Sequence, residues 1–192
     1  MGQVAADHVK EKHPGAVIEW KPFMLRPDMP PEGVELSLWY RATPEREEAR
    51  QRLRARAQEL GLPIKFSAHI PNSRRALEAS EYANSVGKGG EFHRAVLHQF
   101  FAEGRDISDW EVLRQAAVDA GIDAGEMQRR TESGEFAATV TEQDAAAREA
   151  GVHAAPTYFI NDEVKIVGAQ RDDVFEEAIA RLAKGENARA TF

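Results

Sequence analysis

The chain has 192 residues, 42% hydrophobic and 30% charged, a composition that suits one sizeable domain or a small domain with a large insertion. Its net charge of −7 argues against a broad nucleic-acid surface, and no apolar stretch is long enough for a signal peptide or a membrane span. We therefore expect a cytoplasmic protein without nucleic-acid or membrane partners, and the lack of cysteine excludes disulfides and cysteine nucleophiles from these residues.

The first part of the chain combines an expected strand with one well-marked helix. Residues 16–23, AVIEWKPF, are rich in β-formers and predict a strand, whereas the proline-rich residues 26–35 predict a surface loop. Thr43 is a suitable N-cap with Pro44 in the first helical position, so a helix is expected until Gly61. An apolar face on it is predicted by four residues at helical spacing, Ala49, Leu53, Ala57 and Leu60.

The middle of the chain is expected to be helical. After a short β-like piece at residues 64–69, helical periodicity continues from Asn72 for most of the next eighty residues. Within it, Phe92, Val96 and Phe100 recur at one-face spacing. We expect three phenylalanines, Phe92, Phe100 and Phe101, in the helical core. Four further aromatic residues, Trp20, Trp39, Tyr40 and Trp110, are expected in the core or at its rim.

Two more helices in this region have recognisable boundaries. Ser108 and Glu111 have the spacing of a capping box, which predicts a helix that ends at Gly121. A further helix is expected over residues 139–150, with Gly151 directly after it. Strands at both ends of the chain would then flank an all-helical middle, which favours one sheet with a helical insertion, an α/β fold.

The last forty residues predict a hairpin followed by a helix. Residues 153–170, HAAPTYFINDEVKIVGAQ, contain a proline at a strand start, a turn at residues 161–163 and a returning strand over residues 164–167. Acidic residues at 172 and 173 begin an amphipathic C-terminal helix. Tyr158 and Phe159 alternate on the first strand, so one of them should face the core.

Four motifs in order, WKPFMLRPDMPPEG, PNSRRALEASEYA, HAAPTYFIN and GAQRDDVFEEAI, resemble the DsbA-like thiol oxidoreductases of the FrnE type. The resemblance covers nearly the whole chain. It implies a thioredoxin-like sheet with an inserted all-helical domain. The two parts of the thioredoxin-like domain would be residues 1–70 and 151–192, and the insertion residues 71–150.

The resemblance also implies a substrate-binding loop. Pro156 would be a cis-proline between Ala155 and Thr157, and the Ala155 backbone would hydrogen-bond an extended thiol- or disulfide-containing peptide or small molecule. Gln170 within GAQ matches the FrnE pattern. No cofactor is expected for this chemistry.

The chain departs from the family at its redox turn. Family members carry a first strand and a Cys-x-x-Cys turn, typically Cys-Pro-Trp-Cys, followed two residues later by a glycine with which Gly2 aligns. The first strand and both cysteines are therefore expected to be absent from these residues, which makes the chain redox-inactive as it stands. Because that strand lies inside the sheet, we expect an interrupted sheet unless a strand from elsewhere, such as a second subunit of a homodimer, fills the gap.

Several polar residues have two interpretations. Asn72 and Ser73 either cap the first helix of the insertion or contact a thiol ligand in the cleft, as a similar pair does in related glutathione-dependent enzymes. His93 and His98 are five residues apart, about 140° on a helix, and cannot form a one-face ligand pair, so no metal site is expected. His153 is expected to be a solvated loop residue.

Two alternative functions remain open. One is a glutathione-dependent isomerase or transferase of the kappa and 2-hydroxychromene-2-carboxylate isomerase type, for which glutathione would be the cofactor. Those enzymes tend to carry a Ser-Asp pair where this chain has Ala169 and Gln170. The other is a non-catalytic peptide-binding module that keeps the proline groove.

Overall fold

The computed structural model describes residues 2–39 and 43–184, without the side chain of Trp39, so the expectations for Trp39 and Tyr40 fall outside the described residues. Two compact units make up the chain, residues 1–19 with 147–192 and residues 20–146. The units therefore divide at other positions than the domain segments inferred from the resemblance. Those segments, 1–70, 71–150 and 151–192, remain a prediction.

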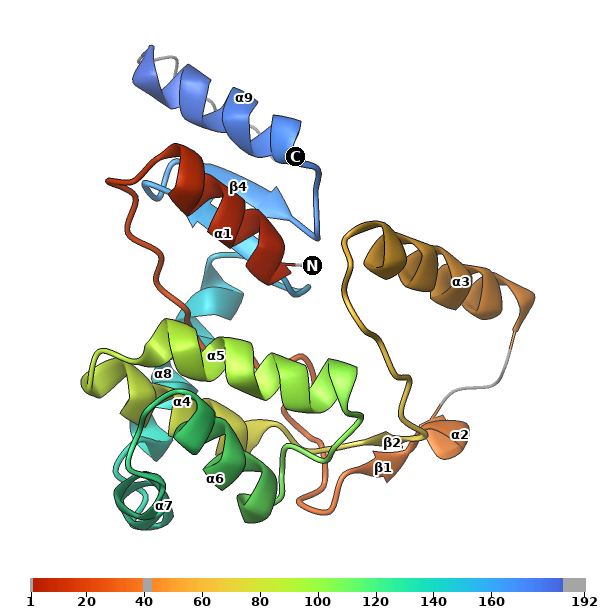
Figure 1. Ribbon diagram of the computed structural model, residues 1–192, viewed down its shortest axis with the longest axis vertical. Helices are drawn as coiled ribbons and strands as arrows, with labels where there is room; N and C mark the ends of the chain where they lie inside the picture. The colour runs from red at the N-terminus through yellow and green to blue at the C-terminus, as the bar shows by residue number, and fades with distance from the viewer. Residues whose placement is uncertain (1, 40–42, 185–192) are drawn as a thin grey trace. The chain divides into compact units, whose positions relative to one another are not determined.

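The first unit is a β-hairpin with two helices (Figure 1). Strands β3, Thr157–Ile160, and β4, Val164–Val167, pair antiparallel, and the expected turn lies between them. The helices are α1, Gly2–Lys12, and α9, Asp172–Ala183. Both cover one face of the hairpin, because a single core cluster contains residues of β4, α9 and α1: Val164, Ile166, Phe175, Ala178 and Ala5.

The second unit is mostly helical. Its helices α4, α5, α6 and α7 span Arg74–Ser85, Gly89–Leu97, Trp110–Asp119 and Ala124–Glu132. Helix α8, Ala137–Glu149, begins in this unit and ends in the first. Phe92, Leu113 and Met127 are fully buried in the core cluster that α4 to α7 share.

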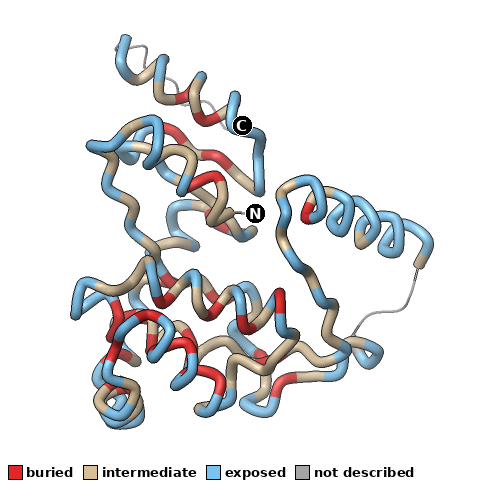
Figure 2. The backbone as a smooth tube through the Cα atoms, in the orientation of Figure 1, coloured by how far each residue is buried: buried red, intermediate tan, exposed pale blue. Residues whose placement is uncertain are grey.

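The remaining elements are short, apart from one exposed helix. Strands β1, Val34–Glu35, and β2, His69–Ile70, form a second two-stranded sheet, and α2 spans Leu36–Trp39. Helix α3, Pro44–Glu59, starts as predicted, since the Thr43 hydroxyl accepts a 3.4 Å hydrogen bond from the Arg46 amide. Its predicted apolar face is wrong: Ala57 is buried, but Ala49 and Leu53 are exposed, as the pale tube in Figure 2 shows for most of the helix.

The strand predicted over residues 16–23 is absent from the described fold. These residues have no regular structure, and the described strands form only the two two-stranded sheets, β1 with β2 and β3 with β4. The prediction rested on β-branched and aromatic composition, which suits a pleated surface but produces a strand only when a partner strand is present. Of the β-like piece at residues 64–69, only His69 is in a strand.

A π-helical turn changes which aromatic residues enter the helical core. Helix α5 continues into η1, His98–Ala102, whose wider turn shifts the register of the following side chains. Gln99 and Ala102 are buried there, whereas Phe101 is 43% exposed and Phe100 only half-buried. The expectation of three core phenylalanines therefore holds for Phe92 alone.

The capping box predicted at Ser108 is displaced by one residue. Asp109 is the N-cap of α6, and its carboxylate accepts a 2.9 Å hydrogen bond from the Glu111 amide. Ser108 lies in the turn before the helix, where its amide and hydroxyl both donate to the Asp106 carboxylate. Asp is as good an N-cap as Ser, so local sequence alone does not separate the two positions.

His93 predicts a specific pH dependence of stability. Its ring stacks on Trp20 with centroids 4.0 Å apart, and burial, assisted by the Arg94 cation, lowers the pKa of His93 to about 4. The folded state thus favours the neutral ring. The resulting stabilisation is complete above the ordinary pKa of about 6.5 and is lost as the pH falls from there toward 4.

His93→Phe keeps a ring against Trp20 but cannot bind a proton. Between pH 7 and pH 5 the free energy of unfolding of the wild-type chain should fall by about 2 kcal/mol more than that of the variant. Urea denaturation at the two pH values measures this difference, with His98→Gln, which alters an exposed histidine, as the control that should follow the wild type. Equal pH dependence of wild type and His93→Phe would refute the assignment.

Candidate functional site

The candidate site is the loop that leads from α8 into β3. The peptide bond between Ala155 and Pro156 is cis. Two hydrogen bonds hold the loop to its own hairpin: the Thr157 hydroxyl donates to the Ala154 carbonyl at 2.7 Å, and the Gly168 amide donates to the Pro156 carbonyl at 2.8 Å. The loop is therefore fixed on both sides of Pro156.

The chain leading into this loop is anchored by Lys165 of β4. Its ammonium group donates to the Gly151 carbonyl at 2.6 Å and to the Ala150 carbonyl at 3.3 Å. These carbonyls directly follow α8, where a cation is favoured by the helix dipole. Lys165 lies opposite Phe159 in the hairpin, so both side chains belong to the hairpin face away from the core.

Backbone polar groups are available at the loop. Ala155 is exposed, and none of the residues that the structure describes forms a hydrogen bond with its amide or carbonyl. Strand β3 continues from this point, and within the described residues it pairs only with β4. An unpaired strand edge can accept an extended segment by backbone hydrogen bonds.

The N-terminus of α1 lies directly against this loop. A Cβ atom on Gly2 would come within 3.1 Å of Pro156 Cγ and 2.9 Å of the Tyr158 hydroxyl oxygen. That hydroxyl donates a 3.0 Å hydrogen bond to the Gly2 carbonyl. Burial raises the pKa of Tyr158 to about 12, so the phenol remains a protonated donor at neutral pH.

This arrangement can stabilise a negative charge beside an extended segment. The amides of the first helical turn are unpaired donors, and the helix dipole adds a partial positive charge there. An anion such as a thiolate is therefore favoured at the start of α1. The Tyr158 contact was not predicted, because Gly2 and Tyr158 are 156 residues apart. The sequence indicated only that either Tyr158 or Phe159 faces the core.

Asn72 and Ser73 belong to the second unit, so each is described there on its own. The Asn72 amide nitrogen donates to the Met29 carbonyl at 2.8 Å and to the Pro30 carbonyl at 3.3 Å, and its oxygen accepts from the Arg74 amide at 2.8 Å. Ser73 makes no side-chain cap. Asn72 thus joins the loop before β1 to the start of α4, and a contact with a ligand remains a prediction.

Gln170 and His153 belong to the same unit as the candidate loop. Gln170 is exposed, and its side-chain nitrogen donates to the Val167 carbonyl at 2.9 Å, which folds it onto its own turn. His153 is exposed, as expected for a loop residue.

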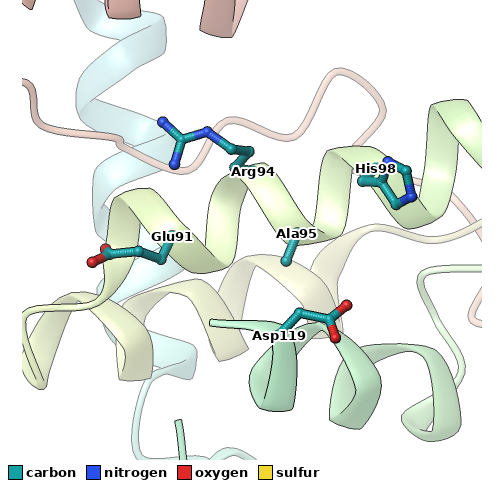
Figure 3. A pocket seen from close by; sticks show the side chains of 5 residues that line it. All are labelled: Glu91, Arg94, Ala95, His98 and Asp119. Atoms are coloured by element: carbon teal, nitrogen blue, oxygen red, sulfur yellow. The ribbon is translucent and has the colours of Figure 1, made fainter. Parts of the chain in front are cut away.

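A separate surface pocket of about 350 Å³ lies between α5 and α6 in the second unit (Figure 3). It is lined by Glu91, Arg94, Ala95, His98 and Asp119. Its two acidic groups already have partners outside the pocket: Glu91 pairs with Lys88 at 3.3 Å, and Asp119 accepts from Gln115 at 2.8 Å. We therefore assign no function to this pocket.

Metal-binding clusters and membrane-spanning helices are both absent from the part of the chain that the structure describes. No three histidine, aspartate or glutamate residues are placed to hold a metal ion. No helix is long and apolar enough to cross a membrane.

Comparison with known proteins bears on the fold and the family of the chain. A family model described as the DSBA-like thioredoxin domain matches residues 1–180. The uncharacterized protein YwbO of Bacillus subtilis (strain 168) is 32% identical over 179 residues, which cover 85% of this chain and 80% of that protein.

Two solved structures share the fold. A crystal structure described as the probable DsbA oxidoreductase SCO1869 from Streptomyces coelicolor matches with a TM-score of 0.83 and 22% identity, covering 99% of this chain and 87% of that one. A 2-hydroxychromene-2-carboxylate isomerase matches with a TM-score of 0.74 and 22% identity, covering 95% and 89%. The predicted thioredoxin-like α/β fold is confirmed.

Proposed function

Because the chain belongs to the family of DSBA-like thioredoxin domains, we propose that it binds an extended segment carrying a thiol or disulfide at residues 155–157. The binding would form the substrate half of a thiol–disulfide exchange site. One observation carries the proposal. The exposed, unpaired backbone of Ala155 continues into the unpaired edge of β3, and the N-terminus of α1 abuts the same loop.

The substrate segment would add to β3 as a further strand. Its amides and carbonyls would pair with those of Ala155 and of the β3 edge, while the sulfur would lie near the start of α1. There the first-turn amides favour a thiolate, the form of sulfur that attacks or leaves in disulfide exchange. Gly2 leaves room for this approach because it has no side chain.

The redox dithiol of such a site is not among the 192 residues, which contain no cysteine. The FrnE resemblance assigns it, with the central strand of the sheet, to a segment ahead of Gly2. Where such a strand pairs with β3, the substrate segment would pair with the Ala155 backbone alone. We therefore propose substrate binding, and no thiol chemistry, for the residues described.

A glutathione-dependent isomerase is the second candidate, supported by the fold shared with the 2-hydroxychromene-2-carboxylate isomerase. The residues that would grip glutathione differ, however. Ala169 has no polar group, and Gln170 donates to the Val167 carbonyl within its own turn. This difference favours an extended peptide over glutathione as the ligand.

Calorimetric titration tests the proposal against this candidate. The probe is a short peptide with one cysteine held as a mixed disulfide with a second cysteine. Glutathione and glutathione disulfide are titrated in parallel. We expect the peptide to bind at least about ten-fold more tightly than either form of glutathione, a difference of about 1.4 kcal/mol.

A matched peptide identifies the mode of binding. Methylation of the backbone nitrogens beside the cysteine removes the donors needed for strand addition but leaves every side chain in place. The methylated peptide should bind much more weakly. Tight binding of glutathione, or equal affinity of both peptides, would count against the proposed function.

A further inference from the structure

We infer that Tyr158 is a positioning residue, whose hydroxyl holds the first turn of α1 at Pro156. The inference rests on the proposed function, because it concerns the geometry of that site. It starts from one contact, the 3.0 Å hydrogen bond from the Tyr158 hydroxyl to the Gly2 carbonyl, which joins β3 to the beginning of α1.

The direction of the Tyr158 hydroxyl is fixed by the packing of its ring. The ring meets Phe175 of α9 edge to face, with centroids 4.9 Å apart and planes at 88°. It also belongs to the shell around the hairpin core, beside Ile160. Phenylalanine would supply the same apolar ring. The contribution specific to the hydroxyl is therefore its hydrogen bond to the Gly2 carbonyl.

The fit between Gly2, Tyr158 and Pro156 is tight. A Cβ atom at residue 2 would lie 2.9 Å from the Tyr158 oxygen, 3.1 Å from Pro156 Cγ and 3.2 Å from Pro156 Cβ. A hydroxyl on one side and the proline ring on the other thus define where the backbone of residue 2 can lie. Because the loop beyond Pro156 is itself fixed by the Gly168 amide, the helix start is held relative to the exposed Ala155 backbone.

Tyr158→Phe removes the hydroxyl and keeps the ring. Loss of a neutral hydrogen bond corresponds to a factor of about five. We therefore expect amide hydrogen exchange in the first hydrogen-bonded turn of α1, from Ala6 onward, to quicken about five-fold, and the dissociation constant of the disulfide peptide to rise about five-fold. Amides of α9 in the same unit should keep their exchange rates.

Tyr82→Phe is the matched control, because it removes a phenol hydroxyl from a buried tyrosine of the second unit. It should leave exchange in α1 and peptide affinity unchanged.

A double-mutant cycle tests the contact independently of peptide binding. Gly2→Ala should raise the α1 exchange rates in the wild-type background, and should do so less in Tyr158→Phe, where the nearest clashing atom is gone. Additive effects of the two substitutions would overturn the inference, as would unchanged exchange in Tyr158→Phe. Faster exchange with unchanged peptide affinity would also overturn it, because the contact would then be only structural.

Failure of the proposed function has a different signature. If the wild-type chain does not bind the peptide, the proposed function fails, while the exchange rates and the cycle still decide whether Tyr158 holds α1.

Discussion

Insulin reduction should appear when a β-forming segment ending in Cys-Pro-Trp-Cys is joined directly ahead of Met1, and the unaltered chain should show none. The turn would then precede Gly2 by the family's spacing and place the first cysteine near the start of α1, against Pro156. A helix N-terminus lowers the pKa of a thiol from about 8.5 to about 7 or below, which raises the thiolate fraction at pH 7 on the order of ten-fold. Turbidity of insulin in the presence of dithiothreitol measures the rate.

Two controls separate position from the mere presence of thiols. Ser-Pro-Trp-Ser in the same segment should be inactive. The same Cys-Pro-Trp-Cys turn joined after Phe192 should give no more activity than free dithiol of equal concentration. Equal activity of the two cysteine-containing chains would show that the start of α1 contributes nothing to the chemistry.

Asp144→Ala should be the most destabilising single substitution among the polar residues discussed. Asp144 of α8 is 5% exposed, and its carboxylate accepts a 2.7 Å hydrogen bond from the Met24 amide, 120 residues away. Met24 is also buried, so the substitution would leave its amide without this acceptor at a position that water does not readily reach. We expect a loss of about 3 kcal/mol in the free energy of unfolding.

Asp144→Asn and Glu142→Ala are the matched controls for this prediction. Asparagine keeps an acceptor oxygen for the Met24 amide, so Asp144→Asn should lower the free energy of unfolding less than Asp144→Ala does. Glu142 is exposed on the same helix, and its replacement should cost less than about 0.5 kcal/mol. The midpoints of urea denaturation are to be compared for the three variants. A loss in Asp144→Ala no larger than in Glu142→Ala would show that the loop at Met24 does not depend on this bond.

Elements with strong local signals were predicted correctly from the sequence. Helix α3 begins after the Thr43 cap, the β3–β4 hairpin turns at residues 161–163, and α9 begins with two acidic residues. Each depends on residues close together in the chain. The strand expected at residues 16–23 failed for the opposite reason, because a strand requires a partner that its own sequence does not specify.

Changes of helical register and contacts between distant residues could not be predicted from local sequence either. The π-turn at His98–Ala102 has no distinctive composition, yet it decides that Gln99 rather than Phe100 is buried. Asp144 could have been found, because it follows the buried Val140 by four residues and so shares its helix face. A carboxylate in that position is unusual enough to suggest a structural partner.

The candidate site was only partly accessible from the sequence. The resemblance pointed to residues 155–157 through the proline that opens β3. The bond between the Tyr158 hydroxyl and the Gly2 carbonyl has no local signal, since only the alternation of Tyr158 and Phe159 indicated that one of them faces inward. Asn72 illustrates the reverse case, because its polar groups, expected either to cap or to bind, are engaged by the backbone of its own unit.

Residue-resolved amide exchange of the chain with and without the disulfide peptide tests the central claim most directly. Strand addition predicts slower exchange at Ala155 and along β3 when the peptide is bound, with smaller changes at the start of α1. The backbone-methylated peptide should produce none of these changes. Protection confined to the pocket of Glu91 and His98, or no protection at residues 155–160, would contradict the account.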